Sequence, residues 1–166
     1  MNITYNIMDY RSPQTPRPVT DYEELHSATR SITSICASRI ANLANASALL
    51  WELLENINWA GFYMMEGGRL VLGPFQGKVA CTEIEVGNGV CGTAVAKEAT
   101  QLVEDVHCFD GHIACDSGSN SEIVVPLFKN GSVIGVLDID SPSFARFSEE
   151  DRIGLEKFAR ILERGL

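Results

Sequence analysis

The sequence lacks any cluster of basic residues. Its 13 Lys and Arg residues are outnumbered by 22 Asp and Glu residues, and the 166 residues carry a net charge of −9. Nucleic acids and anionic membranes attract clustered positive charge, so both are poor partners for this chain. The sequence also has no apolar run near the ~20 residues that a membrane-spanning helix needs, and no apolar signal core near its N-terminus. These absences predict a cytosolic protein.

Cysteine is scarce as well, with five residues in the chain. A chain of this length buries a core without cross-links, and in the cytosol transient disulfides are usually catalytic or redox-sensing. Cys81, Cys91 and Cys115 lie in Gly-rich, polar segments. Such segments predict loops and chemically active thiols, so we interpret these three cysteines as a redox set. Cys36 fits the apolar side of a helix and is interpreted as structural, whereas Cys108 is ambiguous.

Helical patterns at both ends and strand patterns between them predict an α+β domain with one mostly antiparallel sheet and helices packed on it. Residues 1–20 contain three prolines and predict an extended arm, and residues 21–166 predict a single domain. Capping-box spacings start the first and last helices at Thr20 and Ser148. The expected helices are 20–43, 45–54, 93–97 and 148–162, and the expected strands are 59–65, 70–75, 101–106, 121–128 and 132–140.

Three acidic residues belong to the last two expected strands. Asp138 and Asp140 are two positions apart, so they point to the same side of the sheet. Glu122 begins the preceding apolar run. Acids on an apolar face are costly without a partner. The alternative is that the strand is ending and that Asp138 and Asp140 are simply solvated.

The turn between these strands decides whether the acids meet. A two-residue turn at Asn130-Gly131 with regular pairing would place Ile139 opposite Glu122 and turn Glu122 away from the aspartates. A three-residue loop over 129–131 would instead place Glu122 opposite Asp138. We therefore predict the three-residue loop. Opposed carboxylates repel, which should raise one pKa and keep that group protonated near neutral pH.

A zinc site is an alternative role for some of these residues. His107, Cys108, His112 and Cys115 offer four possible ligands within nine positions. Structural zinc sites usually draw closely spaced ligand pairs from two separate segments, whereas here one short run would have to surround the ion alone. We therefore favour a site without metal. The two histidines then either make supporting hydrogen bonds in a turn, or orient a loop or lower the pKa of a thiol.

Six segments of the chain are similar to motifs of one known family, the free methionine-(R)-sulfoxide reductases, which are built on a single GAF domain. These segments are NWAGFY, GPFQGKVAC, GNGVCGTAVA, EDVHCFDGHIACDS, SNSEIVVPL and GVLDIDSP, and the resemblance extends over roughly residues 20–162. It implies a GAF fold and a homodimeric enzyme that reduces the R epimer of free methionine sulfoxide. Thioredoxin would be the electron donor, and no cofactor or metal is implied.

The resemblance also implies roles for individual residues. The attacking cysteine falls on Cys115, the main resolving cysteine on Cys81 and a third redox cysteine on Cys91. The substrate-binding residues implied by the same motifs are Glu122, Asp138, Asp140, Trp59 and Tyr63. Attack of a thiolate on the sulfoxide sulfur requires that the oxygen leave protonated, which a nearby carboxyl group can provide.

A second hypothesis places the chain in another functional class. A GAF domain can also be a binding module that senses a small ligand or redox state without turnover. A sensor would normally be fused to an output domain, for which 166 residues leave no room. We therefore expect the reductase.

Overall fold

The computed structural model describes residues 21–35, 37–109, 111 and 118–166. The predicted arm over 1–20 lies outside these described residues, as do Cys36, His112 and Cys115. The extended arm therefore stays a prediction, and so does the structural role of Cys36.

A six-stranded sheet forms the centre of the described part, and every neighbouring pair of strands whose register is resolved runs antiparallel. The strand order is β3-β2-β1-β6-β5-β4. Two hairpins, β1–β2 and β5–β6, supply the four central strands, as the sequence predicts. β3 was not predicted, and β4 is shorter than expected because Val106–Cys108 turns into a 3₁₀ helix. The strand bounds are β1 Trp59–Glu66, β2 Arg69–Gly77, β3 Glu83–Glu85, β4 Gln101–Val103, β5 Ser121–Lys129 and β6 Ser132–Ser141.

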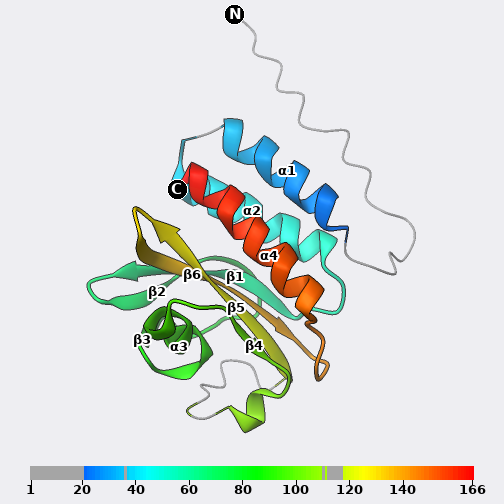
Figure 1. Cartoon of the computed structure of the whole chain (residues 1–166), viewed down its shortest axis with the longest axis vertical. Helices are drawn as coiled ribbons and strands as arrows, with labels where there is room; N and C mark the ends of the chain where they lie inside the picture. The colour runs from blue at the N-terminus through cyan, green and yellow to red at the C-terminus, as the bar shows by residue number, and fades with distance from the viewer. Residues whose placement is uncertain (1–20, 36, 110, 112–117) are drawn as a thin grey trace, which may run out of the picture.

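Helices cover the two faces of the sheet unequally (Figure 1). α1 (Tyr22–Ile35), α2 (Arg39–Leu53) and α4 (Glu149–Leu162) lie on one face, and the short α3 (Gly89–Lys97) lies on the other. A 3₁₀ turn, Glu163–Gly165, follows α4. None of the helices in the described ranges is long and apolar enough to cross a membrane.

The two faces hold separate hydrophobic clusters because side chains alternate along each strand. Phe62, Ile123 and Leu137 point toward the three-helix face. Tyr63 and Val136, their neighbours along the chain, point toward α3. The first cluster is the larger and contains fully buried side chains from all three helices. The smaller cluster beneath α3 leaves room for a site.

The first two helices divide differently from the prediction of one helix to residue 43 and a new one from Asn45. α1 ends at Ile35, and α2 begins at Arg39. Ser38 causes the new start, because its side chain accepts a hydrogen bond from the backbone N–H of Ala41 at 3.4 Å. At the C-terminal helix, by contrast, the predicted capping box between Ser148 and Asp151 is present on both sides.

The β5–β6 hairpin corrects the predicted turn. Asn130 and Gly131 have φ values of 52° and 80°, and Lys129 pairs with Ser132, so the turn has two residues rather than three. The register then shifts by one residue, because Leu127 pairs with Gly135 and Ile134 is left over as a β-bulge.

The bulge determines which residues lie opposite the acids. Glu122 pairs with Asp140, and Asp138 pairs with Val124, so the predicted pairing of Glu122 with Asp138 is wrong. The prediction that all three acids share one face is nevertheless confirmed. The bulge supplies the one-residue shift that the loop was expected to supply.

Candidate active site

A small cavity lies between the sheet and the α3 side of the molecule, and it opens to solvent. The strands contribute acidic and aromatic side chains, and Ser119 and the segments 79–84 and 88–91 contribute the rest of the wall. None of the described residues that line it is a lysine or an arginine. The lining residues are Trp59, Tyr63, Val79, Ala80, Ile84, Asn88, Gly89, Val90, Cys91, Ser119, Glu122, Asp138 and Asp140.

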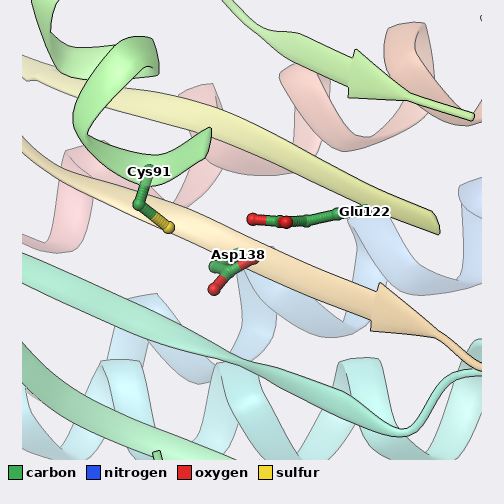
Figure 2. A group of neighbouring side chains, drawn as sticks. All are labelled: Cys91, Glu122 and Asp138. Carbon is green, nitrogen blue, oxygen red and sulfur yellow. The ribbon is translucent and has the colours of Figure 1, made fainter. Parts of the chain in front are cut away.

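Three buried side chains meet at the floor of this cavity (Figure 2). Cys91 is 4% exposed, Glu122 6% and Asp138 7%. One ligand atom from each, the thiol sulfur and two carboxyl oxygens, all lie within 4.8 Å of one another. The Oδ1 atom of Asp138 is buried without a hydrogen-bond partner among the described residues. Burial of two carboxyl groups together is costly unless protons or a bound partner compensate their charge.

Burial raises the pKa of these groups. The pKa of Glu122 lies well above its usual value, mainly because of burial and then because of the charges of Asp138 and Asp140. Burial raises the pKa of Asp138 to about 6, against the opposing effect of hydrogen bonds from Cys91 and Glu122. The expectation that one acid stays protonated near neutral pH therefore fits Glu122. Burial, rather than the predicted repulsion, is the larger cause.

Cys91 differs from its prediction as a loop thiol. It is the third residue of α3, and burial, followed by the charges of Asp138 and Glu122, raises the pKa of its thiol well above the usual value. The glycine that follows it serves close packing. A Cβ atom at Gly92 would collide with the backbone oxygen of Glu85, so the residue lets α3 approach the end of β3. At neutral pH the Cys91 thiol is therefore protonated.

Two aromatic side chains connect the cavity to the segment that carries Cys81. Trp59 donates a hydrogen bond from Nε1 to the carbonyl oxygen of Lys78 at 3.1 Å, and the Tyr63 hydroxyl donates to the carbonyl oxygen of Cys81 at 3.1 Å. Trp59 also stacks on Phe75, with ring centroids 5.2 Å apart. Cys81 is a partly exposed free thiol. Both aromatic residues thus line the cavity and fix the backbone beside this cysteine.

The structure brings six of the eight predicted site residues to the cavity, namely Cys91, Glu122, Asp138, Asp140, Trp59 and Tyr63. Cys81 follows the cavity-lining Ala80, and Cys115 lies outside the described residues. Sequence reasoning missed Asn88 and Ser119. The Gly-rich GNGVCG segment could have indicated Asn88, since Asn is a favoured residue before a helix.

The residues of the alternative zinc site are not assembled in the described part of the chain. Two of the four, His112 and Cys115, lie outside it. His107 Nε2 is 3.0 Å from Oδ1 of Asn120, and the exposed Cys108 thiol donates to Asp105 Oδ2 at 3.4 Å. This hydrogen bond and the charge of Asp105 raise the pKa of Cys108.

Comparison with known proteins agrees with the fold and the motifs. Residues 24–166 match the family model of the GAF domain. The chain belongs to the free methionine-R-sulfoxide reductase family of GAF-domain proteins, as the resemblance of its motifs predicted. It is 57% identical over 145 residues to "Free methionine-R-sulfoxide reductase" of Escherichia coli (strain K12), covering 87% of this chain and 88% of that one.

Solved structures give the same result. This chain superimposes on fRMsr of Staphylococcus aureus in its reduced form with a TM-score of 0.88 and 51% identity, over 92% of this chain and 99% of that one. The free methionine-R-sulfoxide reductase of Neisseria meningitidis in complex with its substrate gives a TM-score of 0.84 and 47% identity, covering 87% of each chain. The predicted GAF fold is thereby confirmed.

Proposed function

We propose that this protein reduces the R epimer of free methionine sulfoxide to methionine. The observation that carries the proposal is the 57% identity to the Escherichia coli enzyme of that name, which extends over 87% of this chain. The cavity supports it independently. It combines acidic groups, an aromatic wall and a buried thiol at one solvent-open site.

The chemistry of the substrate fits the lining of the cavity. Free methionine sulfoxide carries an ammonium group, a carboxylate, a polar sulfoxide and an S-methyl group. We assign the ammonium to Asp138 and Asp140 and the methyl group to the wall formed by Trp59 and Tyr63. With no basic side chain among the described lining residues, the carboxylate requires backbone N–H groups. The start of α3 at Gly89 and Val90 lines the cavity and offers such donors.

We assign the first chemical step to Cys115. Its sulfur attacks the sulfoxide sulfur, a carboxyl group protonates the oxygen, and methionine leaves while Cys115 becomes a sulfenic acid. Glu122 is the favoured proton donor, because burial keeps its pKa well above the usual range. Asp140 is a poorer candidate for this role because it is only partly buried.

We assign the second stage to Cys81 and Cys91. A thiol of one of them condenses with the sulfenic acid to form a disulfide and release water. The lower burial of Cys81 favours it as the first resolving thiol, since Cys91 is buried and its thiol holds its proton. A dithiol protein such as thioredoxin then reduces the disulfide by exchange, which restores both thiols. We also propose a homodimer, an extended arm over residues 1–20 and a cytosolic location.

A thioredoxin-coupled assay tests the proposal. NADPH consumption is measured with free methionine R-sulfoxide, free S-sulfoxide and a peptide-bound sulfoxide as alternative substrates. We expect turnover of the free R epimer alone. Activity on the peptide-bound sulfoxide would contradict the assignment to free substrate. Binding without turnover would favour a sensor module.

A further inference from the structure

We propose that Cys91, Glu122 and Asp138 also form a site for a soft divalent cation, Zn²⁺ or Cd²⁺, which the reduced protein binds at the floor of its cavity. The site consists of one sulfur and two carboxyl oxygens contributed by α3, β5 and β6 (Figure 2). The three residues are far apart in the sequence, and they differ from the His and Cys run that the sequence offers as zinc ligands.

The ligand chemistry selects the metal. A thiolate is a soft ligand that favours Zn²⁺, whereas Mg²⁺ and Ca²⁺ prefer six or more oxygen ligands. Zinc lies about 2.3 Å from sulfur and about 2.0–2.2 Å from carboxylate oxygen, so the ligand atoms of a tetrahedral site are roughly 3.5 Å apart. Here they lie within 4.8 Å of one another. Rotations of the side chains that bring them about 1 Å closer would complete three of the four positions.

A second observation points to a ligand at this place. Asp138 is 7% exposed, and its Oδ1 atom is buried without a hydrogen-bond partner in the described ranges. Such an oxygen costs stability, and a cation beside it would remove that cost. The cavity gives the ion a path from solvent and leaves the fourth coordination position open to water, the arrangement of zinc sites with three protein ligands.

The surroundings favour a cation. Asp140 lines the same cavity and adds negative charge, and no lysine or arginine is present among the described lining residues. Binding of the ion requires the Cys91 thiol to release its proton to solvent, and the two carboxyl groups bind as carboxylates. The ion would thus occupy the floor on which the proposed substrate rests, so the metal and the sulfoxide should exclude each other.

Cadmium titration of the reduced full-length protein tests the site. Binding of Cd²⁺ to a thiolate is followed without oxygen by the charge-transfer absorption of the Cd–S bond in the ultraviolet, and Zn²⁺ is then used to displace Cd²⁺. We expect one equivalent of tightly bound metal. Cys91→Ser and the nearly isosteric Asp138→Asn should each weaken binding at least tenfold. Cys108→Ser, at an exposed thiol outside the cavity, should leave it within twofold of the wild type.

The carboxyl variant separates this site from binding by the other thiols. Metal binding that remains equally tight in Asp138→Asn would overturn the proposal, as would undiminished absorption in Cys91→Ser. Circular dichroism establishes that each variant is folded, and a variant that fails this check leaves the other to decide. Because the titration needs no turnover, its result is independent of whether the proposed reductase activity is found.

Discussion

The stability of Asp138→Asn relative to the wild type should increase as the pH rises. In the folded protein the pKa of Asp138 is raised from 3.8 to about 6, chiefly by burial. A raised pKa means that the folded state holds the proton more tightly than the unfolded state. The stability that Asp138 contributes is therefore fully present below about pH 4 and is lost as the pH rises through about 6.

The magnitude follows from the same shift. At about 1.36 kcal/mol for each pH unit, ionisation of Asp138 lowers the free energy of unfolding by about 3 kcal/mol above pH 7. The amide that the substitution introduces does not ionise in this range. Any constant effect of the substitution cancels when the variant and the wild type are compared across pH. The free energy of unfolding of the variant, relative to that of the wild type, should thus rise by about 3 kcal/mol between pH 4 and pH 8.

Urea denaturation followed by tryptophan fluorescence measures this difference at several pH values under reducing conditions. Glu52→Gln is the matched control, because it makes the same change from carboxyl to amide at an exposed side chain on α2. A gap between Asp138→Asn and the wild type that stays constant from pH 4 to pH 8 would refute the reasoning. It would mean that the buried carboxyl group does not ionise in this range.

Three further predictions concern the cysteines and the packing around them. Cys115→Ser should abolish both reduction and the trapping of a sulfenic acid, whereas Cys81→Ser should still release one methionine per site and then recycle poorly; loss of even that single turnover would exchange the two roles. Tyr63→Phe removes the hydrogen bond to the Cys81 carbonyl, so it should cost about 1 kcal/mol of stability and slow steady-state turnover more than the single-turnover yield of methionine. An equal effect on steady-state turnover and on the single-turnover yield would place Tyr63 in the first step alone. Gly92→Ala should cost about 1–3 kcal/mol, because its Cβ would meet the backbone of Glu85, and an unchanged melting temperature would contradict this packing.

Side-chain alternation made much of the site predictable. Asp138 and Asp140 are two residues apart, and so are the pairs Trp59 and Gly61, and Gly61 and Tyr63, so each set had to share a face once its segment was a strand. The hairpins were predictable because Gly67-Gly68 and Asn130-Gly131 supply residues that tolerate positive φ. These are local rules, and they apply without knowledge of the rest of the fold.

The errors arise where contacts distant in sequence decide the structure. The burial of Cys91 depends on how α3 packs over β5 and β6, and a Gly-rich segment gives no sign of this. The start of α2 depended on one serine, Ser38, in a stretch with continuous helical periodicity. The bulge at Ile134 has no sequence signature such as a glycine at the extra position.

The bulge at Ile134 also changes which length variants of this protein can keep the site. Beyond the bulge, Leu127 faces Gly135 and Glu122 faces Asp140. A regular two-residue hairpin that lacked Ile134 would have this same pairing. Deletion of Ile134 would therefore leave the acids on their shared face, whereas deletion of a residue between Gly135 and Asp138 would alter the spacing of the acids from the turn. Natural insertions and deletions in this strand should accordingly be tolerated at the hairpin tip and nowhere closer to the cavity.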